Sequence, residues 1–131
     1  PQLDEYYVSV IVHGVDFIIH DLQSEFQQVV LNIVNNARDA LVEKKIKNAK
    51  ITVETYVENS SGFVIIQDNA GGVPLEIIDR VFEPYFTTKE QGKGTGIGLY
   101  MSKMIVVNMK GNISVSNTQE GARFEIELNI I

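Results

Sequence analysis

The chain has 131 residues, of which 44% are hydrophobic, so it is long enough to bury the core of one domain. The absence of cysteine excludes disulfides and thiolate metal sites, and two histidines argue against a histidine-rich metal site. The net charge of −6 argues against nucleic-acid binding, and no apolar run reaches the roughly 20 residues that span a bilayer. The length predicts a single domain, residues 1–131. No signal peptide is visible, and because the chain begins at Pro1 rather than Met, we expect it to be cut from a longer protein.

The first third of the chain is predicted to hold two strands and a long helix. Residues 6–12 and 17–19 are rich in β-branched and aromatic side chains and predict strands, with a turn at residues 13–16 between them. Asp21 is a candidate N-cap for a helix that begins at Leu22. Apolar residues at helical spacing form the face of this helix that we expect to be buried: Leu22, Phe26, Val29, Val30, Ile33, Ala37, Ala40 and Leu41.

A second stripe on the same helix is polar and consists of Gln28, Asn32, Asn35, Asn36 and Asp39. Asparagine disfavours helix interiors because its amide competes for backbone hydrogen bonds. The stripe could simply face solvent, but a solvated helix face usually carries Lys and Glu, as the end of this helix does. We therefore interpret the asparagines as candidate functional residues.

The rest of the chain alternates only partly between strands and helices, which favours an α+β sandwich over a doubly wound sheet. Strands are predicted at residues 50–58, 63–67, 113–116 and 123–128. Pro74 is expected to start a short helix that runs to Val81. A second long helix is predicted at residues 98–108, with Gly111 closing it and with four apolar residues facing inwards: Leu99, Met101, Ile105 and Val106.

An aspartate–glycine turn follows the apolar strand at 63–67, with Asp68 at the end of the strand. An ionised carboxylate accepts hydrogen bonds, so Asp68 suits the exocyclic amine of adenine and repels the carbonyl oxygen of guanine. Gly71 and Gly72 lack side chains that would block a base. The alternative interpretation is an ordinary Asp-Asn-Gly turn.

A second glycine cluster, Gly94, Gly96 and Gly98, precedes the second long helix. Free N–H groups at a helix start form a phosphate site, whereas the alternative is a flexible loop ending at a helix cap. The spacing matches neither the Rossmann fingerprint nor the P-loop, and the motifs of eukaryotic-type protein kinases are absent. Lys89 and Lys93 flank the loop and are either partners for phosphate charge or ordinary surface lysines. An asparagine on the polar stripe could offer an oxygen to the Mg²⁺ that accompanies a triphosphate.

Four motifs, in order and spacing, resemble those of the ATP-binding catalytic domain of two-component sensor histidine kinases. Residues 32–37 resemble the N box, 68–74 the first glycine box, 82–89 the F box and 94–99 the second glycine box. The resemblance covers nearly the whole chain, and four motifs in register are more specific than any one of them.

The resemblance implies the two-layer α/β sandwich shared with DNA gyrase B, MutL and the large heat-shock chaperones. In this α+β fold, a mixed and mostly antiparallel sheet is covered on one face by about three helices. ATP and Mg²⁺ are the implied ligands, with Asn36 binding the metal through its amide oxygen and Asn32 beside it as the second catalytic residue. Asp68 would bind the adenine amine, residues 89–93 would form a short lid, and the remaining nucleotide-binding residues would be Ala70, Gly72, Lys89, Lys93, Gly94, Thr95, Gly96, Ile97, Gly98 and Leu99.

The chain departs from the usual family pattern at Ala70, where glycine is common, and after the N box, where Arg38 follows as in sensor kinases of the nitrogen-regulation type. His20 begins a stretch that resembles the start of a phosphoacceptor box. We reject it because it directly precedes the N box and lacks the expected proline. The acceptor histidine is expected on a separate helical domain upstream.

The implied function is transfer of the ATP γ-phosphate to a histidine on the helical dimerisation and phosphoacceptor domain of the same parent protein, with a response regulator downstream. Asn32 stands where ATPases of this fold usually carry a glutamate, and an amide cannot act as a general base, so we expect slow hydrolysis. The alternatives are an ATPase of the same fold and a non-catalytic nucleotide-binding docking module.

The domain is expected in the cytoplasm without nucleic-acid or membrane contact, whether or not its parent protein has a membrane anchor. The aromatic cluster Phe82, Pro84, Tyr85 and Phe86 is expected either in the core, under the lid, or against the acceptor helices.

Overall fold

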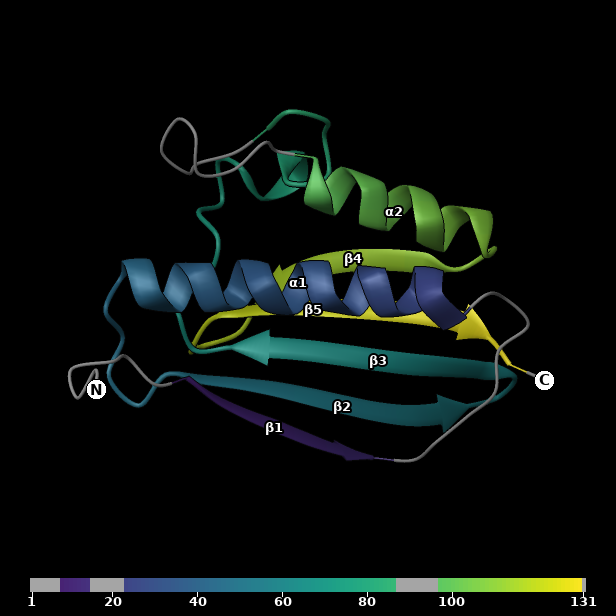
Figure 1. The fold of residues 1–131 in the computed structure, drawn as a ribbon, viewed down its shortest axis with the longest axis horizontal. Coiled ribbons are helices and arrows are strands. Elements are labelled where there is room, and N and C mark those ends of the chain that lie inside the picture. Colours follow the sequence, from purple (N-terminus) through teal and green to yellow (C-terminus); the bar gives the residue numbers. More distant parts are fainter. Residues whose placement is uncertain (1–7, 15–22, 87–96, 131) are drawn as a thin grey trace.

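A five-stranded sheet carries the helices of the chain on one face (Figure 1). The computed structural model describes residues 8–14, 23–86 and 97–130. Its elements in chain order are β1 (Ser9–Gly14), α1 (Gln23–Glu43), β2 (Lys50–Glu58), β3 (Ser61–Asp68), a 3₁₀ helix (Ile78–Arg80), α2 (Gly98–Asn108), β4 (Asn112–Asn117) and β5 (Ala122–Asn129).

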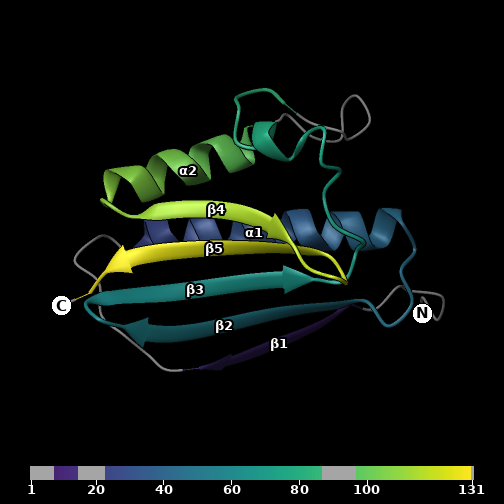
Figure 2. The ribbon, with the colours of Figure 1, turned by 180° about the vertical axis from the view of Figure 1, so that it is seen from behind.

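The strand order is β1-β2-β3-β5-β4, in which β1 and β2 are parallel and the other neighbours are antiparallel. Figure 2 shows the opposite face of the sheet, which no described helix covers. The predicted α+β class and the mixed, mostly antiparallel sheet are confirmed. The described residues form two α-helices and one short 3₁₀ helix, in rough agreement with the three helices expected.

The core lies between α1 and the sheet. Val29, Ile33 and Leu41 of α1 are fully buried, as are Ile51 of β2 and Ile126 of β5. The predicted apolar face of the long helix is therefore confirmed over residues 26–41, because its other members are buried or half-buried. Asp21 and Leu22, like the predicted strand at 17–19, lie outside the described residues.

Strand pairing moves two predicted boundaries. The predicted turn at 13–16 is wrong at its start, since parallel pairing with β2 carries β1 through His13 and Gly14. The strand predicted at 63–67 begins earlier, at Ser61, because a two-residue turn joins β2 to β3 and pairs Glu58 with Ser61. The predicted bounds of β2 and α2 match the observed ones.

One prediction about the helices holds only in part, and another is wrong. The segment expected to form a short helix from Pro74 to Val81 contains turns and only the three-residue 3₁₀ helix, because so short a segment gains too few hydrogen bonds to offset helix nucleation. On α2, Met101 is 45% exposed, whereas Ser102 and Val106 are fully buried. The face of α2 that packs inwards is therefore centred on Ser102 and Val106 rather than on Met101.

Gly111 contributes to the end of α2, as predicted, although it is not the residue in the left-handed conformation. Lys110, not Gly111, takes the left-handed conformation, with φ of 62°. Gly111 donates its N–H to Val106 at 2.9 Å. A Cβ atom on Gly111 would overlap the carbonyl of Glu127 and lie 2.8 Å from Cδ2 of Leu128, so close packing against β5 requires glycine here.

This packing predicts opposite effects of two neighbouring substitutions. Gly111→Ala should destabilise the domain by about 1–3 kcal/mol, because the added methyl group overpacks the contact with β5. Lys110→Gly should stabilise it by up to about 1 kcal/mol, because an L-residue is strained in the left-handed region. Urea unfolding measures both, and a neutral Gly111→Ala variant would contradict the steric argument.

Candidate functional site

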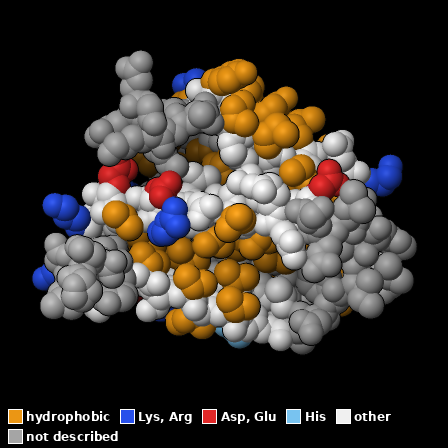
Figure 3. All heavy atoms as spheres, viewed as in Figure 1, with side chains coloured by type: hydrophobic (Ala, Val, Ile, Leu, Met, Phe, Trp, Pro, Cys, Tyr) orange, Lys and Arg blue, Asp and Glu red, His pale blue; other side chains and the backbone are white. Residues whose placement is uncertain are grey.

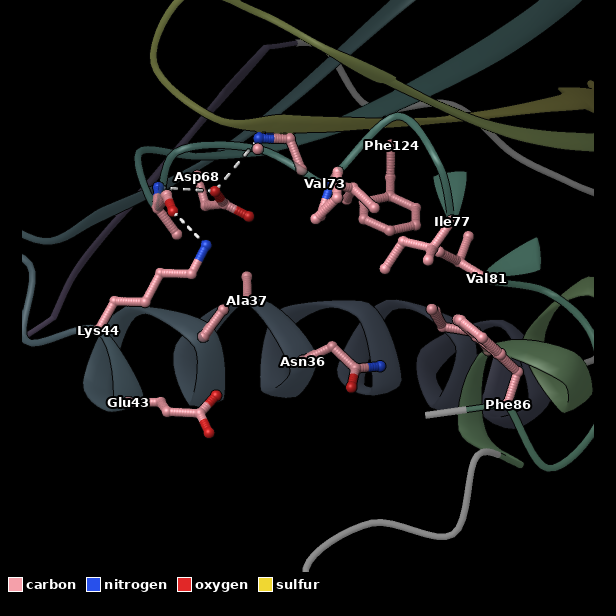
Figure 4. Close-up of a pocket in the computed structure, with 16 residues that line it drawn as sticks. Asn36, Ala37, Glu43, Lys44, Asp68, Val73, Ile77, Val81, Phe86 and Phe124 are labelled. Atoms are coloured by element: carbon pink, nitrogen blue, oxygen red, sulfur yellow. Dashed lines mark hydrogen bonds between the residues drawn. The ribbon is translucent and has the colours of Figure 1, made fainter. Parts of the chain in front are cut away.

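A cavity of about 310 Å³ lies between α1 and the segment that follows β3. Figure 4 shows Asn36 and Ala37 of α1 on one side, facing Val73, Ile77 and Phe124 on the other. Asp68 and Lys44 lie towards one end of the cavity, and Phe86 lies towards the other. The cavity is thus a slot with mainly apolar walls and polar groups at defined positions.

Asp68 is the last residue of β3, and its two carboxylate oxygens are used differently. Oδ1 accepts hydrogen bonds from the backbone N–H of Ala70 at 2.9 Å and of Ala122 at 3.3 Å. Within the part of the chain that the structure describes, Oδ2 makes no hydrogen bond, and Figure 4 shows it pointing into the cavity. Asp68 therefore presents one oriented, unsatisfied acceptor to a ligand.

The turn after Asp68 requires glycine for its backbone. Gly71 and Gly72 have φ of 91° and 88°, in the left-handed region that side chains disfavour. Gly72 and the buried Ala70 line the cavity, whereas Gly71 is exposed and lies outside it. The methyl group of Ala70 is accommodated, since this residue is 3% exposed and packs in the core.

Lys44 is a cavity residue that sequence reasoning missed. The sequence pattern predicts that Lys44 lies at the solvated end of the helix, but its Nζ donates a hydrogen bond to the Ala70 carbonyl at 2.8 Å. Its spacing held the signal, because Lys44 follows Ala37 and Ala40 at intervals of three and four, and all three line the cavity.

Asn36 and Asn32 lie on the same face of α1 but in different surroundings. Asn36 lines the cavity, and its Nδ2 donates to the Asn32 carbonyl at 3.0 Å, which turns Oδ1 away from that carbonyl. The Nδ2 of Asn32 donates to the Gly98 carbonyl at 3.3 Å and to the Ser102 hydroxyl at 3.1 Å. Its Oδ1 accepts from Gln28 at 2.9 Å. Asn32 thus joins α1 to α2 and does not line the cavity.

The start of α2 lies next to Asn32. Ile97 is the N-cap residue of this helix, and a Cβ atom on Gly98 would lie 4.0 Å from Cγ of Asn32. Leu99 lines the cavity, whereas Ile97 and Gly98 do not. The other predicted nucleotide-binding residues, Lys89, Lys93, Gly94, Thr95 and Gly96, lie outside the described residues, as does the predicted lid.

The aromatic cluster divides among different environments. Phe82 packs against the core, with its ring edge-to-face with Phe124 at 6.1 Å. Phe86 lines the cavity under the guanidinium of Arg80, which lies 4.6 Å from the ring centroid. Tyr85 is 77% exposed. Core packing thus explains Phe82, whereas Phe86 contributes to the cavity wall.

The arrangement suits a flat heterocycle that carries an amino group. The apolar walls can cover its two faces, and Oδ2 of Asp68 can accept from the amine. Among the described residues, no three His, Cys, Asp or Glu side chains gather to hold a metal ion. An Mg²⁺ ion would therefore need oxygen ligands of another kind, such as the Asn36 amide together with phosphates and water.

Comparison with known proteins assigns the chain to a family. Residues 21–130 match the family described as histidine kinase-, DNA gyrase B- and HSP90-like ATPases. The two-component sensor PprA of Pseudomonas aeruginosa is 37% identical over 114 residues, which are 85% of this chain and 12% of PprA. The sensor histidine kinase GlnK of Bacillus subtilis is 32% identical over 138 residues, which cover 98% of this chain and 33% of GlnK. The chain therefore spans only a small part of the relatives it matches.

Solved structures show the same fold. The nucleotide-free catalytic domain of the histidine kinase ThkA superposes with a TM-score of 0.79 at 26% identity, over 93% of this chain and 78% of that one. The mycobacterial sensor histidine kinase MprB gives a TM-score of 0.80 at 22% identity, over 94% and 82% of the two chains. None of the described helices is long and apolar enough to cross a membrane. The resemblance inferred from the four motifs is confirmed, and the chain belongs to the histidine kinase-, DNA gyrase B- and HSP90-like ATPase family.

Proposed function

We propose that this chain is the ATP-binding catalytic domain of a sensor histidine kinase and that it transfers the γ-phosphate of ATP to a histidine on a separate helical domain. One observation carries the proposal: Oδ2 of Asp68, which accepts no hydrogen bond from the described residues, points into an apolar slot that also contains Asn36. The family and the relatives named as sensor kinases support the same activity.

Adenine binds with its amino group on Asp68 and its ring between the apolar walls. The small side chains of Ala37 and Ala40 leave room on the α1 side, and Val73 and Phe124 cover the other side. Guanine is disfavoured because its carbonyl oxygen would face the carboxylate, leaving two acceptors without a proton between them. The base end of the slot thus selects the nucleotide.

Phosphates extend from the base towards Asn36 and the start of α2. The Asn36 oxygen is a ligand of the type that Mg²⁺ prefers, and the bound ion would neutralise phosphate charge. The N–H groups in the first turn of α2 favour an anion nearby. Lys89, Lys93 and residues 94–96 stay predicted contributors to phosphate binding.

Phosphoryl transfer depends mainly on positioning and charge neutralisation, so the acceptor histidine must come to the cavity on a partner surface. Figure 3 shows apolar side chains gathered over α2, where Met101, Met104 and Val107 are 45%, 39% and 48% exposed. This apolar surface, together with the exposed ring of Tyr85, suits an apolar helical partner. Asn32 offers no general base for water, so transfer is favoured over hydrolysis.

The first test combines nucleotide binding with transfer. ADP and an ATP analogue, each with Mg²⁺ at 100 times its Kd, should raise the melting temperature by roughly 10 °C, and guanine nucleotides should not. With labelled ATP, the helical domain of the parent protein should then become labelled when the two are mixed. Tight ATP binding without any label on the histidine would support the non-catalytic docking module, and rapid phosphate release would support an ATPase.

Asp68→Asn should weaken ADP binding by about 10- to 100-fold, because a charge-assisted hydrogen bond becomes a neutral one or a clash of donors. Discrimination between ADP and GDP should fall at the same time. Asp79→Asn, an exposed aspartate of the 3₁₀ helix, is the matched control and should bind as the wild type does. Calorimetric titration of each variant with both nucleotides measures the change, and unchanged discrimination would exclude the role given to Asp68.

Asn36→Ala should remove the part of the ATP affinity that depends on Mg²⁺ while leaving affinity without the metal nearly unchanged. The reason is that the amide oxygen is the proposed metal ligand, whereas the base site is intact. Asn35→Ala removes the neighbouring amide, which does not line the cavity, and serves as the control. Titrations with Mg²⁺ and with EDTA give the difference, and a normal response to Mg²⁺ in Asn36→Ala would refute the metal assignment.

A further inference from the structure

The wall of the cavity opposite α1 includes a loop whose backbone is held by a distant side chain. Residues 71–74 belong to no helix or strand, yet both polar backbone groups of Val73 are satisfied. The Val73 N–H donates to Oδ1 of Asn117 at 2.8 Å, and Nδ2 of Asn117 donates to the Val73 carbonyl at 2.8 Å. One amide side chain thereby takes the place of a neighbouring strand.

The glycine before Val73 is explained by the same contact. A Cβ atom on Gly72 would lie only 2.8 Å from Oδ1 of Asn117, so a larger residue would push the loop away from this amide. In the sequence, the absence of a side chain at Gly72 predicts clearance for a base. The structure assigns it a further constraint, which is the close approach of the loop to Asn117.

Asn117 also lies at the junction with the residues that hold Asp68. It is the last residue of β4, and its partner across the hairpin is Ala122 of β5. The backbone N–H of Ala122 donates to Oδ1 of Asp68, and the side chains of Ala122 and Phe124 line the cavity. Asn117 therefore joins the loop that carries Val73 to the hairpin that orients the carboxylate.

We propose that Asn117 is a positioning residue of the purine site: it does not line the cavity, and it acts by holding Val73 at a fixed distance from Asp68. A wall that is already in place does not have to be ordered when the ligand binds, so affinity for the base is higher. The proposal rests on the proposed function for the identity of the ligand, and on the two hydrogen bonds for the position of the wall.

The experiment compares three variants in the intact chain. Asn117→Ala removes both hydrogen bonds, Asn117→Asp keeps only the acceptor for the Val73 N–H, and Asn112→Ala is the control. Asn112 is an exposed asparagine at the other end of β4. Binding of adenosine and of ADP is measured at a temperature at which every variant is folded, and hydrogen exchange of the Val73 amide is measured without ligand.

Asn117→Ala should weaken adenosine and ADP by the same factor, about 5- to 30-fold, because the loss lies at the base end and corresponds to one or two hydrogen bonds. Asn117→Asp should also weaken binding, because its second carboxylate oxygen would face the Val73 carbonyl oxygen without a proton between them, and Asn112→Ala should leave binding unchanged. The response of ADP binding to Mg²⁺ should be unaffected in all three. Exchange of the Val73 amide should become faster in Asn117→Ala alone.

Wild-type affinity in Asn117→Ala, or an equal loss in Asn112→Ala, would overturn the proposal. Failure of the proposed function has a different signature, in which the wild type binds no purine at all. The exchange rate of Val73 would in that case still report whether Asn117 holds the loop, since this measurement needs no nucleotide.

Discussion

The division of roles between the two oxygens of Asp68 sets the geometry of the cavity. Oδ1 is held by backbone N–H groups from both sides, one in the turn that follows β3 and one at the start of β5. Gly121 must be glycine for this to occur, because a Cβ atom there would overlap the backbone of Asp68. The direction of Oδ2 is thus set before a ligand arrives, and an acceptor that is already oriented needs no reorganisation on binding.

The long helix α1 connects this acceptor to the other end of the site. Its apolar face packs on the sheet, and its polar stripe, at the same helical spacing, presents Asn36 to the cavity. The amide nitrogen of Asn32 donates to the start of α2, and the ammonium of Lys44, the residue directly after α1, donates to the turn after Asp68. One rigid helix therefore sets the distance between the Asp68 end of the cavity and the start of α2. Separate loops would fix this distance less precisely.

Local patterns predicted the elements that are decided locally. The bounds of β2 and α2 and the buried face of α1 follow from periodicity. Asp68 and Asn36 of the motifs line one cavity, and their roles in binding stay predictions. The missed features depend on contacts between residues far apart in the sequence. Lys44 lies 26 positions from the carbonyl that it binds, and Asn117 lies 44 from Val73. The need for glycine at position 111 likewise comes from packing against β5, which no local pattern contains.

The charged side chains that line the cavity are distributed unequally between its two ends. The chain carries a net charge of −6. Of the described residues that line the cavity, Lys44 is the only lysine or arginine. That cation lies beside Asp68 at the base end, where it binds a backbone carbonyl, and not beside Asn36. Under the proposed function, the described residues at the phosphate end would contribute helix dipoles and the amide oxygen of Asn36, and positive charge would come from Mg²⁺ and from the predicted contributors Lys89 and Lys93. If the proposal is right, the carboxylate selects the base, and the metal makes binding of a polyanion to an acidic domain favourable.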